Sequence, residues 1–142
     1  MAHMIPDTPP GWGPGKASER DLYEALRDRL DDEFFVYHSL PLFVPKHGKE
    51  AEIDFLVLHR EHGMLAIECK GQGVSCDGSG RWRRRVDGAW QDMERGPLEQ
   101  AQDQVHALGQ LLRERIGAVF TSYAGELPFT FGHAAAFPRT LL

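Results

Sequence analysis

The sequence predicts an α/β protein, because segments with helical periodicity are interspersed with short apolar runs typical of β-strands. Residues 19–30 and 97–115 place apolar side chains at helical spacing, residues 52–70 have the pattern of a β-hairpin, and residues 129–137 have that of a buried strand. With 142 residues, of which 42% are hydrophobic and 26% charged, the chain is large enough for one domain with its own core.

The first fifteen residues are expected to stand apart from this domain. Met1 to Met4 have the form of a cloning remnant with a second start, and the four prolines and three glycines of residues 6–15 disfavour any regular element. We therefore interpret residues 1–15 as a tag remnant and mobile arm, and residues 16–142 as the domain. Because the chain stops four residues after Pro138, we expect a domain excised from a longer protein.

The first predicted helix follows Ser18, a suitable N-cap. Glu19 lies in its first turn, where a carboxylate stabilises the helix dipole, although it could also reach toward a site. The second helix begins at Pro97 and is expected to end near Arg115, before Gly117.

Between the helices, residues 34–40 are predicted to form a strand that ends at Pro41, with residues 42–44 continuing it past a bulge. A polar loop, residues 45–49, then leads to the acidic hairpin at residues 52–70. If Leu58 opposes Met64 across the hairpin turn, Asp54 opposes Glu68, with Cβ atoms about 5 Å apart.

Two carboxylates at that distance repel each other unless a cation lies between them, and a divalent metal satisfies both. Lys70 lies on the same strand face as Glu68, which places an ammonium group beside this site. Two acids and a lysine suit metal-assisted hydrolysis of a phosphodiester. A purely structural ion-pair cluster is disfavoured, because burying charges in an apolar strand pair costs desolvation energy.

A second hairpin, with its turn at Asp87 and Gly88, carries a concentrated group of arginines. Arginine forks can bind phosphate, and an interleaved tryptophan can stack on an exposed base. The alternative is a solvated hairpin whose arginines pair with neighbouring acids. The candidate DNA-binding residues are Arg81, Trp82, Arg83, Arg84, Arg85 and, in the earlier polar loop, Lys49.

Composition limits the compartment and the partners. The net charge of −5 argues against a generally basic nucleic-acid binder, but a local basic patch is compatible with DNA. Cys69 and Cys76 form no disulfide framework, which favours a reducing cytoplasm, and no apolar run reaches membrane-spanning length. His59 and His62 lack a third ligand nearby, so a zinc site is disfavoured.

Three motifs carry a resemblance to a known family: Glu52-Ile53-Asp54, Ile67-Glu68-Cys69-Lys70-Gly71 and Pro97-Leu98-Glu99-Gln100-Ala101. In this order, from about residue 15 to residue 138, the chain resembles the NERD (nuclease-related) domain of the PD-(D/E)xK nuclease superfamily. The resemblance implies a restriction-endonuclease-like core, a mixed central β-sheet flanked by α-helices.

It also implies roles for individual residues. Asp54, Glu68 and the Cys69 carbonyl would bind Mg²⁺ or Mn²⁺, and Lys70 would be the catalytic lysine. Gln100 would be the helix glutamine, and Glu19 the acid of the first helix that completes the site. The sequence departs from the family at Gly96, where asparagine is frequent.

The expected function is therefore a metal-dependent nuclease that hydrolyses phosphodiester bonds in DNA. Because such domains often occur joined to helicases or kinases, the alternative is a catalytically silent DNA-binding or tethering module of a larger helicase-type protein.

Overall fold

The computed structural model describes residues 1–44, 48–120 and 125–140, except for the side chains of Val44 and Lys49. The elements in chain order are β1 (His3–Ile5), α1 (Ala17–Arg29), β2 (Phe34–Val44), β3 (Lys49–His59), β4 (Gly63–Cys69), β5 (Val74–Cys76), β6 (Trp82–Val86), β7 (Ala89–Asp92), α2 (Pro97–Val119) and β8 (Phe131–Ala136). Among these described elements, no helix is both long enough and apolar enough to cross a membrane.

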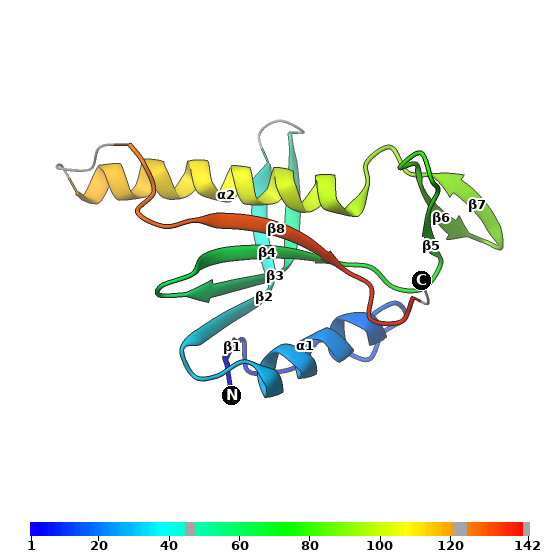
Figure 1. Ribbon diagram of the computed structural model, residues 1–142, viewed down its shortest axis with the longest axis horizontal. Helices are drawn as coiled ribbons and strands as arrows, with labels where there is room; N and C mark the ends of the chain where they lie inside the picture. The colour runs from blue at the N-terminus through cyan, green and yellow to red at the C-terminus, as the bar shows by residue number, and fades with distance from the viewer. Residues whose placement is uncertain (45–47, 121–124, 141–142) are drawn as a thin grey trace.

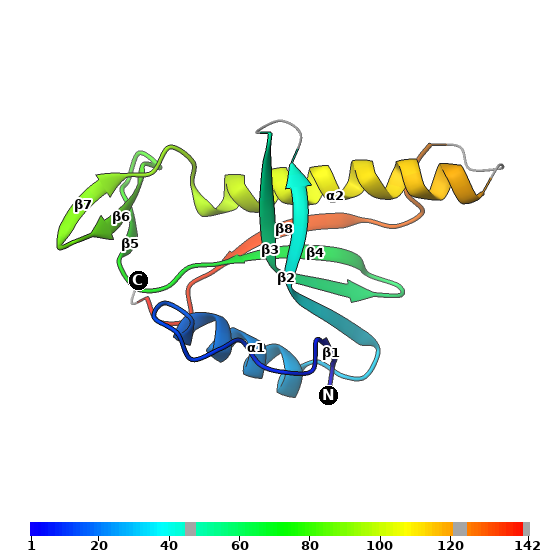
Figure 2. The ribbon, with the colours of Figure 1, turned by 180° about the vertical axis from the view of Figure 1, so that it is seen from behind.

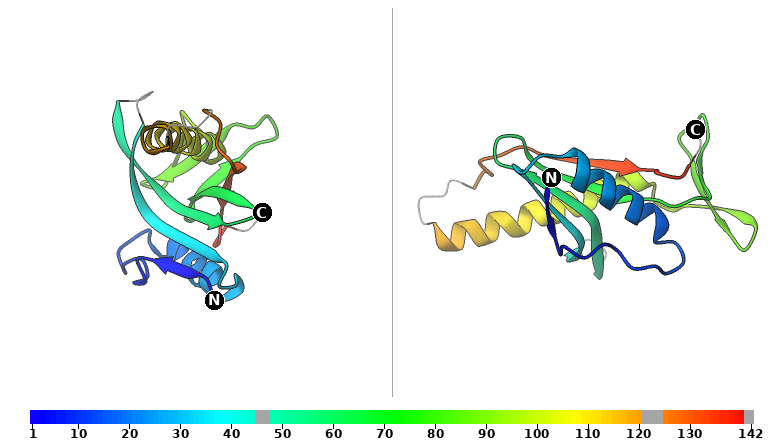
Figure 3. Two further views of the ribbon diagram at one scale, coloured as in Figure 1. Left: turned by 90° about the vertical axis from the view of Figure 1, so that its left-hand side faces the viewer. Right: turned by 90° about the horizontal axis from the view of Figure 1, so that it is seen from below.

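The main sheet has the strand order β1-β2-β3-β4-β8. Its two outer pairs, β1 with β2 and β4 with β8, are parallel, whereas β3 is antiparallel to both of its neighbours, β2 and β4. Helix α2 covers one face and α1 the other, so the sheet is the middle of three layers (Figures 1 and 3). The α/β class and the mixed sheet flanked by helices are thus confirmed.

A smaller antiparallel sheet, in the order β5-β6-β7, lies at one end of the molecule beside the start of α2 (Figure 2). Its last hairpin turns at Asp87 and Gly88, with φ values of 49° and 81°. Both residues therefore adopt the positive φ that a two-residue hairpin turn requires, as their sequence predicts.

Two hydrophobic clusters hold the layers together. The cluster under α2 contains Leu42, Ile53, Leu56, Met64, Ala66, Val105 and Leu108. The cluster under α1 contains Ala2, Tyr23, Val36, Phe55, Val57, Ile67 and Cys69. Each large side chain removed from water in this way contributes about 1.5–3 kcal/mol before the loss of chain entropy.

The alternation of side chains along β3 shifts near Asp54. Ile53 and Leu56 belong to the same cluster, although strict alternation would send residues three positions apart to opposite faces. In β2, the paired residues skip Ser39, whose φ of 53° is unusual for a residue other than glycine. The simple face assignment that grouped Asp54 with Leu56 therefore does not hold across this point.

Three details differ from the sequence-based expectations. Helix α1 begins at Ala17, and its N-cap, Lys16, makes no side-chain capping bond, so Ser18 is a buried residue inside the helix and not its cap. Strand β2 continues to Val44 as expected, but Pro41 lies inside it and does not end it, and the irregularity falls at Ser39. Helix α2 continues through Gly117 to Val119, beyond the expected end near Arg115.

The segment that the sequence sets apart contacts the rest of the fold. His3 and Ile5 of β1 pair with β2, and Ala2 is buried under α1. Residues 6–15 form no helix or strand, but the Tyr23 hydroxyl donates a 2.8 Å hydrogen bond to the Asp7 carbonyl. These contacts place residues 1–15 against β2 and α1.

Candidate active site

The acidic hairpin has the predicted register over most of its length. Leu58 pairs with Met64, but the ladder between β3 and β4 ends one step before Asp54 and Glu68. Beyond that point β4 pairs only with β8, so β3 and β4 separate at the acids. The predicted direct pair of Asp54 with Glu68 is therefore not part of the ladder.

Asp54 bridges the opening between the two strands. Its Oδ2 accepts a 2.8 Å hydrogen bond from the backbone N–H of Cys69, in the middle of the Glu-x-Lys motif. Burial, and after it the charge of Glu68, raises the pKa of Asp54 from an ordinary 3.8 to about 7, although the Cys69 hydrogen bond opposes the shift. The raised pKa reflects the two features of this position: it is shielded from water, and it lies close to the carboxylate of Glu68.

Glu68 is buried and receives a hydrogen bond on each carboxylate oxygen. Lys70 Nζ donates to Oε1 at 2.6 Å, and the side-chain amide of Gln104 donates to Oε2 at 3.3 Å. The same amide nitrogen also donates to the Glu52 carbonyl at 3.1 Å. Gln104 Oε1 is buried without a hydrogen-bond partner among the described residues. Glu68 is thus fixed in position between β4 and α2.

The glutamine that reaches the acids is therefore Gln104. Gln100, which the sequence favours, instead donates its side-chain amide to the Arg95 carbonyl at 3.2 Å, at the start of α2. Helical periodicity offered a clue, because Gln104 shares the buried face of the helix with Ala101, Val105 and Leu108. A buried glutamine on an apolar face needs polar partners.

Glu19 lies near the acids but is held by a neighbour. Lys16 Nζ donates to both of its carboxylate oxygens, at 2.9 and 2.8 Å. This bond raises the pKa of Lys16, with smaller contributions from the charges of Glu52 and Asp54. The charge of Glu19 also contributes to the raised pKa of Asp54. Glu19 is thus both a first-turn acid and a member of the acidic environment.

The donor set at the strand opening fits a hard divalent cation. Asp54 and Glu68 supply carboxylate oxygens, and the backbone carbonyl of Cys69 lies between Glu68 and Lys70 in the chain. Within the described part of the chain, no group of three or more His, Cys, Asp or Glu side chains is arranged to hold a metal ion. Because Mg²⁺ commonly binds one or two carboxylates and retains several waters, the carboxylates of Asp54 and Glu68 are enough to hold it.

The basic hairpin divides its residues between different surroundings. Trp82 stacks on Phe137, with ring centroids 5.5 Å apart and planes 10° from parallel. A β-carbon built on Gly96 would lie 2.6 Å from Cδ1 of Trp82, so this ring fills the space that a side chain at position 96 would need. Trp82 therefore packs against Phe137 within the protein, and its stacking on a base stays a prediction.

The arginines differ in their partners. Arg83 Nε lies 3.1 Å from Asp92, as the solvated-hairpin interpretation predicts. Arg84 and Arg85 are exposed, and the described residues provide no ion-pair partner for either. Arg81 is exposed at the preceding turn. The side chain of Lys49 is outside the described residues.

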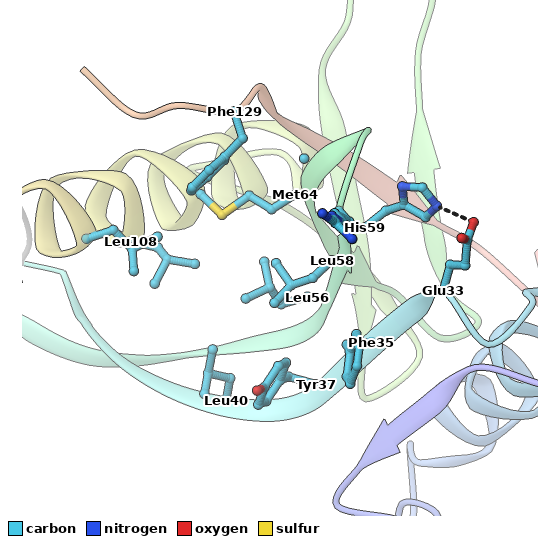
Figure 4. A pocket seen from close by; sticks show the side chains of 13 residues that line it. Glu33, Phe35, Tyr37, Leu40, Leu56, Leu58, His59, Met64, Leu108 and Phe129 are labelled. Carbon is cyan, nitrogen blue, oxygen red and sulfur yellow. Dashed lines mark ion pairs between the residues drawn. The ribbon is translucent and has the colours of Figure 1, made fainter. Parts of the chain in front are cut away.

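A cavity of about 500 Å³ lies elsewhere, between the antiparallel strands and the middle of α2 (Figure 4). Leu56, Met64, Leu108 and Phe129 contribute to its apolar lining, and Glu33 lies at its edge (Figure 4). None of the acids at the strand opening lines it. Its lining is mainly apolar and brings no pair of carboxylates together beside a lysine, so the strand opening is the better candidate for the chemistry.

A mixed sheet between two helices, with an aspartate on one strand and Glu-x-Lys on the next, defines a restriction-endonuclease-like core. This is the fold class of nuclease-type proteins. The chain belongs to the nuclease-related domain family, NERD, whose model matches residues 14–127. No curated protein and no solved structure matches the chain.

Proposed function

We propose that this nuclease-related domain is a metal-dependent deoxyribonuclease that hydrolyses phosphodiester bonds in DNA. The observation that supports this proposal best is the strand opening, where the partly buried Asp54 lies near the buried Glu68 and Lys70 contacts Glu68 at 2.6 Å. Two hard acids and a cationic donor at one place suit the transfer of a phosphoryl group.

Asp54, Glu68 and the Cys69 carbonyl would hold Mg²⁺ or Mn²⁺. Bound there, such an ion would lower the pKa of a water and neutralise charge on the phosphate. Lys70 is partly exposed, with 24% of its side chain accessible, so its ammonium can orient the attacking water or offset charge that develops on the phosphate oxygens.

The surrounding residues support these groups. Gln104 fixes the second oxygen of Glu68, and Glu19 adds negative charge next to Asp54. Gln100 supports the start of α2 through Arg95. Arg84 and Arg85 supply positive charge for the DNA backbone, which is consistent with local binding by a chain of net negative charge.

Two wider proposals concern the compartment and the partner of the domain. Cys69 and Cys76 are both free thiols, which is compatible with the proposed reducing cytoplasm. A helicase or another domain of a longer chain remains a proposed partner, by analogy with the family.

The test is cleavage of linear and circular DNA by the purified domain, with and without Mn²⁺. Asp54→Ala and Lys70→Ala should each abolish metal-dependent cleavage, while Asp87→Asn, which the positive φ of this exposed turn tolerates, should leave it unchanged. Cleavage of the circular substrate would indicate an endonuclease, and cleavage of the linear substrate alone an exonuclease. Full activity in either site variant would refute the assignment.

The alternative, a silent DNA-binding or tethering module, is favoured by one observation. Lys70 already neutralises Glu68 at 2.6 Å, and an acid with a pKa of about 7 can stay protonated, so the site can exist without a metal. Calorimetry with Mg²⁺ and Mn²⁺ separates the two functions. A catalytic site binds the ion through Asp54 and Glu68, whereas a tether has no such requirement.

A further inference from the structure

One side of the small sheet points away from the packed contact of Trp82. Directly opposed residues of an antiparallel pair share a face, and Arg85 opposes Trp90 while Arg83 opposes Asp92. Trp82 lies on the other face, where it stacks on Phe137. We call the side formed by Arg83, Arg85, Trp90 and Asp92 the outer hairpin face.

Trp90 differs from the other two tryptophans of the chain in how its ring is covered. Trp82 is stacked on Phe137. Trp12 is 88% exposed, but the Arg20 guanidinium lies over one face of its ring, 3.3 Å from the centroid. Trp90 is 48% exposed, and the guanidinium of Arg85 lies 6.0 Å from its centroid, at the outer limit of a cation–π contact. Its ring therefore offers an accessible π surface beside a cation.

The outer hairpin face lies close to the acids along the chain. Strand β4 ends at Cys69 and β5 begins at Val74, so the extended chain from Lys70 to Val74 spans at most about 14 Å. Trp82 also contacts Gly96, the N-cap of α2, which ties the small sheet to the helix that carries Gln104. A nucleic-acid strand bound on this face can thus continue toward the strand opening.

We propose that the outer hairpin face binds unpaired nucleotides of single-stranded DNA, with a base stacked on Trp90 and the backbone phosphates held by Arg83 and Arg85. The proposal rests on the proposed function, in which DNA is the substrate. Stacking requires an exposed base face, which a duplex hides within its base stack. A phosphate would compete with Asp92 for Arg83.

The test is fluorescence anisotropy of a labelled oligothymidylate, measured with the full chain in EDTA so that no metal-dependent cleavage occurs. Trp90→Ala should weaken binding on the order of tenfold, which lies within the range that stacking of one base on an aromatic ring contributes. Trp90→Phe should retain most of the affinity. Trp12→Ala, a change of the same size at another exposed tryptophan, should leave the affinity unchanged.

A charge variant and a duplex complete the design. Arg85→Ala should reduce the salt dependence of binding by about one released counterion. A labelled duplex of the same length should bind with an affinity that Trp90→Ala does not alter. Since Trp90 is a surface residue, thermal melting of each variant should match that of the wild type. Tryptophan fluorescence provides a second readout of binding: oligothymidylate should quench it in the wild type, and this quenching should be lost in Trp90→Phe.

The outcomes separate this inference from the nuclease assignment. Unchanged oligothymidylate affinity in Trp90→Ala, or an equal loss with the duplex, overturns the outer hairpin face as a single-strand site, even if the protein cleaves DNA. Trp90-dependent binding without Mn²⁺-dependent cleavage supports the face and refutes the catalytic function.

Discussion

Replacing Asp54 with asparagine is expected to stabilise the metal-free protein at about pH 8, although the change removes a proposed metal ligand. The reason is the raised pKa of Asp54, about 7 against an ordinary 3.8, caused first by burial and then by Glu68. Asparagine has nearly the same shape and can still accept the Cys69 hydrogen bond, but it carries no charge to desolvate.

The direction of the change in stability with pH follows from the proton that Asp54 binds. Between pH 3.8 and about 7 the folded protein retains the Asp54 proton that the unfolded chain has released. The contribution of this group to stability is therefore complete below pH 3.8 and is lost as the pH rises to about 7. At about 1.4 kcal/mol per pKa unit, the loss is at most about 4 kcal/mol, and we expect Asp54→Asn to recover about 2–4 kcal/mol.

The assay is urea unfolding in EDTA at several pH values between about 4 and 8, with the difference between wild type and variant as the result. Asp21, Asp28 and Asp77, whose pKa values are lowered by hydrogen bonds, produce the opposite slope, but they contribute equally to both proteins. Asp87→Asn, at an exposed turn, is the matched control and should show no such difference. Equal stability of wild type and Asp54→Asn at about pH 8, or a less stable variant, would refute the reasoning.

Two further substitutions test the surroundings of the site. Gln104→Ala should lower the free energy of unfolding by about 1–3 kcal/mol and reduce cleavage, because it removes a hydrogen-bond donor from the buried Glu68. Gln100→Ala should reduce cleavage less, because Gln100 bonds to the Arg95 carbonyl and not to Glu68. A larger loss of cleavage in Gln100→Ala would contradict this arrangement. Gly96→Asn should destabilise by about 1–3 kcal/mol through collision with Trp82, measured by urea unfolding, and an unchanged midpoint would show that the ring can move aside.

The sequence was informative where local rules govern the structure. The spacing of the acidic hairpin predicts the pairing of Leu58 with Met64, and the Asp87-Gly88 turn predicts the second hairpin. The family match over residues 14–127 agrees with the order of motifs along the chain. Such features depend on turn geometry and residue order, which are visible without the fold.

What the sequence could not predict depends on contacts between distant segments. The break in alternation opposite Ser39 ends the β3–β4 ladder before the acids, and strand periodicity assumes no such break. The choice of Gln104 over Gln100 depends on how α2 is rotated above β4. The stacking of Trp82 on Phe137 joins residues that are 55 positions apart, so no local sequence pattern could predict it.

The stack of Trp82 on Phe137 has a consequence for the products of cleavage. It joins the small sheet to the segment directly after β8, whose partner β4 carries Glu68 and is followed at once by Lys70. If the outer hairpin face holds one base while those residues cut the backbone, this stack sets the number of nucleotides between the held base and the broken bond. The DNA fragments that the wild-type protein produces would then have a narrow range of lengths, and the Trp82→Ala variant would produce a broader range.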